Sequence, residues 1–168
     1  MPIVQVDTLQ FDFPSTWATS KYDEWVFYCA QFRGMWDGIK AVDLLALDPD
    51  QTAWFIEVKD YRMHVRTKPS ELGGEVARKV FDTLAAMLPA KLNANDTEEV
   101  KMATAVLKAK KLRVVLHLEQ PKKRSALRPR AIDPANVLQT LRRLLKPIDA
   151  HPIVAETTRM ESVGWSVK

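Results

Sequence analysis

Short apolar runs and amphipathic segments alternate along this chain of 168 residues. Two runs, 41–47 and 52–60, flank the turn-forming stretch Asp48-Pro49-Asp50-Gln51, and this arrangement predicts an antiparallel hairpin. The β-branched run at 112–119 predicts a buried strand. Residues 2–13 alternate loosely and are expected to form an edge strand or an extended arm.

Apolar residues at helical spacing predict four helices, followed by a closing strand or hairpin. The expected helices cover 15 or 19 to 33, 74 to 88, 96 to about 110 and 134 to about 146, and the closing strand or hairpin covers 153 to 167. Pro89 is expected to lie beyond the end of the second helix. Asp96 with Glu99 has the pattern of a capping box for the third helix, and Asp133-Pro134 supplies an N-cap and a first helical position for the fourth.

The order of these elements predicts one domain, residues 1–168, of the layered α/β or α+β class. Hydrophobic residues make up 46% of the chain and charged residues 27%, which is typical of a soluble globular protein. The chain has neither a basic start followed by an apolar run nor about 18 consecutive apolar residues. We therefore expect a cytoplasmic protein with no membrane segment.

Positive charge is concentrated in one part of the chain. Between Lys101 and Lys146 there are 13 Lys and Arg against two acids, whereas the rest of the chain has 12 against 19. Concentrated positive charge attracts a phosphate backbone. The candidate nucleic-acid-binding residues are Lys122, Lys123, Arg124, Arg128 and Arg130, with Arg142 and Arg143 as further contacts. The same pattern is compatible with a basic loop that is simply solvated.

Charged residues interrupt both strands of the expected hairpin. Glu57 and Lys59 lie two residues apart in the run WFIEVKDY, so their side chains project from the same face of the strand. Asp43 is the one charged residue in AVDLLAL. Pairing about the turn places Asp43 opposite residues 56 to 58, close to the carboxylate of Glu57.

Two adjacent carboxylates repel each other unless they are protonated or bridged by a cation. Asp43 and Glu57 therefore predict a Mg²⁺ or Mn²⁺ site, with the Val58 carbonyl as a third ligand. Lys59 would orient or help to deprotonate a water molecule, or stabilise a pentacovalent phosphorus, and these parts suit phosphodiester hydrolysis. The alternative is a structural charge pair between Glu57 and Lys59 at the solvated end of a strand, with Asp43 as a cap.

These residues resemble the motif of the PD-(D/E)XK nuclease superfamily: Asp43, thirteen intervening residues, then Glu57-Val58-Lys59. The resemblance covers about Ser20 to Leu118. It implies a restriction-endonuclease-like core, in which a central mixed β-sheet is flanked by helices.

The resemblance also implies roles for individual residues. Asp43 and Glu57 would bind the metal, and Lys59 would serve the water. Members often place a further acid on the first helix, and Glu24 is the matching candidate, with Asp23 as the less favoured choice. Val42 stands where Pro is frequent before the first acid, and Asp37 is a less favoured alternative to Asp43. Arg78, Lys79 and Asp82 are available on the helix after the hairpin.

The sequence thus predicts a metal-dependent nuclease that acts on DNA in preference to RNA, as a homodimer or within a larger complex. The alternative is a non-catalytic nucleic-acid-binding or protein-interaction module on the same fold. Trp36, in a loop flanked by glycines, is a candidate for stacking on substrate. His117, inside an apolar run, is interpreted as a core histidine and not as a metal ligand.

Overall fold

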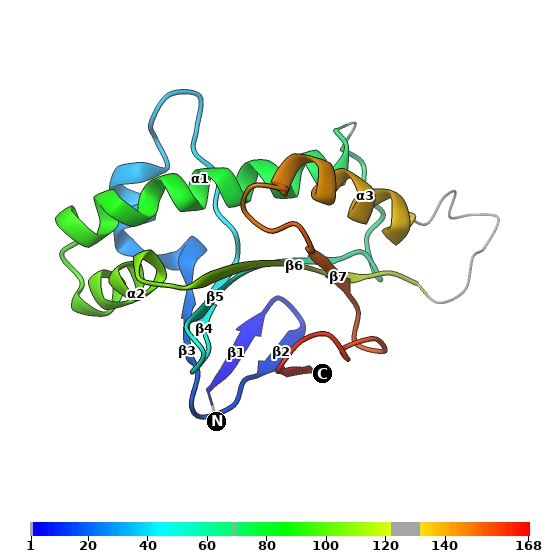
Figure 1. Cartoon of the computed structure of the whole chain (residues 1–168). Helices are drawn as coiled ribbons and strands as arrows, with labels where there is room; N and C mark the ends of the chain where they lie inside the picture. Colours follow the sequence, from blue (N-terminus) through cyan, green and yellow to red (C-terminus); the bar gives the residue numbers. More distant parts are fainter. Residues whose placement is uncertain (1, 69, 122–131) are drawn as a thin grey trace.

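The computed structural model describes residues 2–68, 70–121 and 132–168, which form a mixed α/β structure with two sheets (Figure 1). The larger sheet has five strands in the order β3-β4-β5-β6-β7. These strands are β3 (Ala18–Lys21), β4 (Leu44–Leu47), β5 (Thr52–Asp60), β6 (Lys111–Glu119) and β7 (Ile153–Ala155). The first three strands pair antiparallel, whereas β6 runs parallel to β5 and to β7. The sheet is therefore mixed, as the family resemblance implies.

A second, three-stranded sheet has the order β1-β2-β8. It consists of β1 (Ile3–Val6), β2 (Leu9–Asp12) and β8 (Ser166–Val167), all paired antiparallel. The extended segment expected at 2–13 is thus a hairpin. The C-terminal segment does not form one hairpin, because β7 joins the large sheet and β8 joins the small one.

Three α-helices are present in the described part of the chain: α1 (Leu72–Asn93), α2 (Thr97–Leu107) and α3 (Pro134–Leu145). Asp96 caps α2 by accepting from the backbone N–H groups of Glu98 and Glu99, and Asp133 caps α3 through Ala135. The N-cap roles of Asp96 and Asp133 are confirmed. The reciprocal bond of a capping box is not formed, because the Glu99 carboxylate accepts from the backbone N–H groups of Val26 and Phe27. None of the helices in these ranges has the length and apolar character needed to cross a bilayer.

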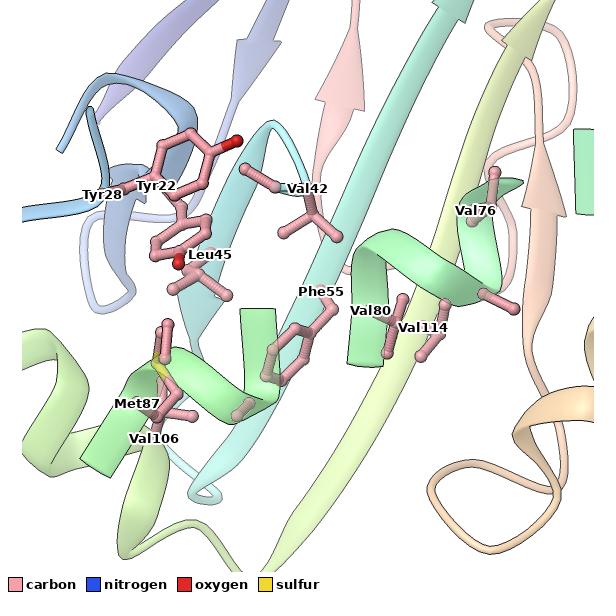
Figure 2. Packing of buried hydrophobic residues seen from close by; sticks show 14 of the residues in the cluster. Tyr22, Tyr28, Val42, Leu45, Phe55, Val76, Val80, Met87, Val106 and Val114 are labelled. Atoms are coloured by element: carbon pink, nitrogen blue, oxygen red, sulfur yellow. The ribbon is translucent and has the colours of Figure 1, made fainter. Parts of the chain in front are cut away.

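The helices cover one face of the large sheet, and the small sheet packs on the opposite face (Figure 1). Alternate residues of β5 contribute to two separate cores for this reason. Phe55 packs on the helical side, while Trp54 and Ile56 lie in the core against the small sheet. Figure 2 shows the helical side, with Phe55 near Val80 of α1. The two-sided burial explains the nearly continuous apolar sequence of β5.

The helix expected from 15 or 19 to 33 is not formed as predicted. Residues 18–21 form the edge strand β3, and they are followed by a 3₁₀ turn, η1 (Tyr22–Glu24), and a π-helical segment, η2 (Tyr28–Phe32). Two tertiary interactions override the helical periodicity. β3 pairs with β4 in the register Lys21↔Leu44, and Trp17 stacks on Trp54 at 5.8 Å between ring centroids.

Helix α1 continues past the expected stop, with Pro89 inside it and Asn93 as its last residue. Its last turns bury Met87 and Ala90 in the helical core, and this burial compensates for the hydrogen bond that proline cannot donate. The basic residues Lys122, Lys123, Arg124, Arg128 and Arg130 lie outside the described residues.

Candidate functional site

The β4–β5 hairpin brings Asp43 and Glu57 together where β4 begins, near the C-terminal end of β5. Leu44 pairs with Ile56, so the next position places Asp43 opposite Glu57, within the predicted register. The backbone N–H of Val58 donates to Asp43 Oδ2 at 2.6 Å. On the other side, the N–H of Tyr22 donates to the Asp43 carbonyl at 3.0 Å. Asp43 is therefore held between the ends of β3 and β5.

Glu57 is fully buried and is held by two lysines. Its Oε1 atom accepts from Lys59 Nζ at 2.6 Å and from Lys79 Nζ at 2.5 Å. Lys59 is on the same strand and the same face, whereas Lys79 comes from α1. Oε2 of Glu57 is buried and has no hydrogen-bond partner among the described residues. One oxygen of this carboxylate is thus neutralised by ammonium groups, and the other has no partner in the described part of the chain that offsets its burial.

Burial and neighbouring charges shift the pKa values of the acids and of Lys59 in this site. Burial, with a further contribution from Asp43, raises the pKa of Glu57 to about 7 despite the two lysines. Burial and Asp43 likewise raise the pKa of Asp23 to about 6. Burial on its own lowers the pKa of Lys59, but the Glu57 carboxylate outweighs it and the pKa is raised above its usual value. Lys59 is consequently an ammonium group at neutral pH.

The structure places Asp23, and not Glu24, in the cleft with Asp43. The Glu24 side chain is 64% exposed and forms an ion pair with Lys21. Asp23 is half-buried, and its Oδ1 atom is buried without a partner in the described part of the chain. Both acids stand in η1 and not on the predicted helix, and the change of element turns Asp23 toward the site.

A cleft of about 660 Å³ opens over these groups. It is lined by six Lys and Arg side chains against three acids, so its surroundings favour an anionic ligand. The lining residues are Asp23, Tyr28, Arg33, Lys40, Ala41, Asp43, Lys59, Lys68, Ser70, Glu75, Arg78 and Lys79. Some of this charge is paired, because Lys68 contacts Glu75 and Arg78 contacts Asp82.

Helix α1 also fixes the chain that leads into Asp43. Asp82 Oδ2 accepts from the backbone N–H of Lys40 at 2.8 Å, and Thr83 Oγ1 accepts from that of Val42 at 3.1 Å. Sequence reasoning named Asp82 only as an available polar residue and did not find the role of Thr83. A threonine inside a helical apolar stripe gave no signal of its own.

Burial settles the interpretation of His117 and locates Trp36 and Asp37. His117 is 1% exposed and its Nε2 lies 2.9 Å from Glu119 Oε1, which confirms the core interpretation. Trp36 is 91% exposed and Asp37 is also exposed, in the loop that precedes Asp43.

The donor set fits a single hard cation that retains water ligands. Within residues 2–68, 70–121 and 132–168, no group of three or more His, Cys, Asp or Glu side chains forms a complete metal cage. Mg²⁺ commonly binds through one or two carboxylates together with waters and substrate phosphates, so Asp43 and Glu57 suffice. The unpartnered oxygens of Glu57 and Asp23 are consistent with this. The Val58 N–H is turned toward Asp43, and the carbonyl of a strand residue faces the same side as its N–H.

Comparisons with known proteins assign no family to this chain. No family model matches the sequence, and no solved structure matches it. Among curated proteins, the chain is similar to a cysteine–tRNA ligase of Neisseria meningitidis serogroup A / serotype 4A, with 29% identity over 208 aligned positions. The match takes in 99% of this chain and 30% of the ligase, so the chain spans about 30% of the length of that relative.

Proposed function

We propose that this domain is a metal-dependent nuclease that hydrolyses phosphodiester bonds, with Asp43, Glu57 and Lys59 as its central residues. One observation carries the proposal. Asp43, just before β4, lies opposite Glu57 of β5, and two lysines contact the Glu57 carboxylate beside a cleft whose lining is predominantly basic. Side chains in this arrangement suit the binding of a divalent cation and the phosphate that the cation would activate.

We assign the finer fold, a restriction-endonuclease-like core of the PD-(D/E)XK superfamily, as part of the same proposal. Three features support it: an antiparallel β3-β4-β5 unit, the parallel strand β6 next to β5, and α1 packed across the face that carries Glu57. In this assignment the extra acid is Asp23 in place of Glu24, because Asp23 lines the cleft.

Asp43 and Glu57 would hold Mg²⁺ or Mn²⁺, together with the Val58 carbonyl. When bound, the cation supplies a polarised phosphoryl oxygen and an acidified water. Lys59 is protonated, so it stabilises negative charge that develops on the phosphate and orients the water; it does not act as a base. Lys79 holds Glu57 Oε1 from the α1 side, so Oε2 is the oxygen of this carboxylate that would serve the cation.

Substitution of Glu57 by Gln tests the proposal. The purified protein is incubated with supercoiled plasmid, linear duplex, single-stranded DNA and tRNA, each with Mg²⁺, Mn²⁺ or EDTA. The tRNA is included because the similar protein is named a cysteine–tRNA ligase. Glu57→Gln is expected to reduce metal-dependent cleavage by at least ~100-fold, since it removes a metal ligand. Glu98→Gln, at an exposed acid of α2, is the matched control and should cleave normally.

A second candidate function is nucleic-acid binding without hydrolysis. Its specific support is that Lys59 and Lys79 already neutralise one oxygen of Glu57, which lets the acid remain in place without a metal. In that case no metal promotes cleavage, and EDTA leaves binding unchanged. Cleavage by Glu57→Gln at the wild-type rate would contradict the nuclease proposal directly.

A further inference from the structure

An exposed tryptophan stands on a well-defined loop beside the cleft. Trp36 is 91% exposed, whereas the other four tryptophans of the chain are buried or half-buried. Its φ is +48°, a conformation that side chains other than glycine rarely adopt. In Figure 1 the light-blue loop that holds it stands out beyond α1. The fold thus holds a large aromatic ring in solvent, in an unfavourable backbone conformation.

The loop is closed by its own hydrogen bonds. The backbone N–H of Ile39 donates to the Arg33 carbonyl at 3.0 Å, and that of Gly38 donates to the Met35 carbonyl at 3.0 Å. The Tyr28 hydroxyl donates to the Ile39 carbonyl at 2.9 Å and ties the base of the loop to η2. Trp36 is therefore presented on a pre-organised tip, which reduces the ordering cost of binding.

Both ends of the loop belong to the cleft. Arg33 and Lys40, which bracket the tip, line the cleft together with Lys59 and Lys79. Trp36 follows Arg33 by three residues, a separation of at most about 11 Å along the chain. A phosphate in the basic cleft and a base on the indole ring are thus within reach of one another. Aromatic side chains next to a positively charged groove are the usual components of single-strand binding.

We propose that Trp36 stacks on an unpaired base of the nucleic acid whose backbone enters the cleft, so that the substrate of this domain is single-stranded or locally unpaired. The inference rests on the proposed function, because it takes the cleft as the place where a phosphodiester is bound. Base pairs inside a continuous duplex are stacked on their neighbours and offer no free face to the ring. The unpaired strand gains both the indole contact and the cationic contacts of the cleft.

The test is a binding titration with a fluorescein-labelled oligothymidylate and with a labelled duplex, both in EDTA so that cleavage is absent. The variants are Trp36→Ala, Trp36→Phe and, as a control, Leu92→Ala, which truncates an exposed apolar residue at the far end of α1. Trp36→Ala is expected to weaken single-strand binding about 10-fold or more, with Trp36→Phe close to wild type. The duplex should bind more weakly than the single strand does to the wild-type protein, and its affinity should be the same in all variants. Quenching of the exposed indole emission by the oligonucleotide gives a second readout.

Single-strand affinity that is unchanged in Trp36→Ala would overturn the inference, as would an equal loss on duplex. Absence of any nucleic-acid binding by the wild-type protein would also overturn it and would favour a protein partner for the loop. Failure of the nuclease proposal is seen separately. A wild-type protein that binds the single strand through Trp36 but cleaves nothing with Mg²⁺ or Mn²⁺ retains this inference and loses the enzymatic one.

Discussion

Glu57 shows how a single buried acid can be tolerated in an apolar strand. Its pKa lies at about 7 instead of its usual 4.5, so the folded protein holds a proton there that the unfolded chain has already released. Stability therefore falls as pH rises from about 4.5 through about 7, and the penalty is complete above that window. The shift corresponds to roughly 3 kcal/mol.

We expect this penalty to appear in urea unfolding measured in EDTA at pH 5 and at pH 8. Relative to Glu57→Gln, wild type should lose up to about 3 kcal/mol of unfolding free energy between the two pH values. Asp23 titrates in both proteins, so its contribution largely cancels. Addition of Mg²⁺ at pH 8 should restore stability to wild type and not to the variant, because the cation stabilises the ionised carboxylate. A difference between the two proteins that does not change with pH would contradict the assignment of the shift to Glu57.

At the scale of elements, α1, which supplies Lys79 to the site, packs closely against α3. Gly73, in the first turn of α1, faces Thr140 of α3, and a Cβ added at Gly73 would lie 2.8 Å from Thr140 Cβ. The neighbouring Gly74 has nothing within 4 Å of its added Cβ. The two positions share a helix turn and differ in their packing, so they form a matched pair.

Gly73→Ala should destabilise the protein by about 1–3 kcal/mol through overpacking against α3. Gly74→Ala should leave stability unchanged or raise it by up to about 1 kcal/mol, because alanine favours the helix. Thermal or urea unfolding of both variants measures these effects. Equal effects at the two positions would show that helix propensity, and not the α1–α3 contact, governs this turn.

The elements also show which features the sequence could predict. Strands β5 and β6 and the caps of α2 and α3 were predictable because local signals and tertiary packing agree there. The segment 18–33 was not, since β3 pairs at the sheet edge and Trp17, just before it, packs against the other core, which periodicity does not reveal. The juxtaposition of Asp43 and Glu57 was predictable, because a charge in an apolar strand costs free energy unless another group compensates it. Thr83 was not, because polar residues on a helix are usually solvated, and Lys79 was named only as one of three available residues on that helix.

At the scale of the whole molecule, the separation of charge predicts the salt dependence of binding. The basic stretch of the chain, 101–146, includes Lys122, Lys123 and Arg124, whose positions the structure does not describe. Each phosphate contact adds about 0.7 to the slope of log K against log[salt] for a single strand and about 0.9 for a duplex. If these three residues reach the backbone while the cleft holds the reacting phosphate, their charge adds to the affinity without altering the chemistry.

Replacement of all three by Ser should therefore lower the salt slope by about 2 to 3 and weaken binding on every nucleic-acid sequence to a similar degree. The rate at which bound substrate is cleaved should stay unchanged, since Asp43, Glu57 and Lys59 are not substituted. The control triple removes the same charge from three exposed lysines that do not line the cleft. They are Lys91 in α1, Lys101 in α2 and Lys108 just after α2. Equal slopes for the two triples would mean that net charge alone drives association. A lower slope confined to the first triple would show that Lys122, Lys123 and Arg124 contact the nucleic-acid backbone beyond the cleft and extend the binding surface of this small domain.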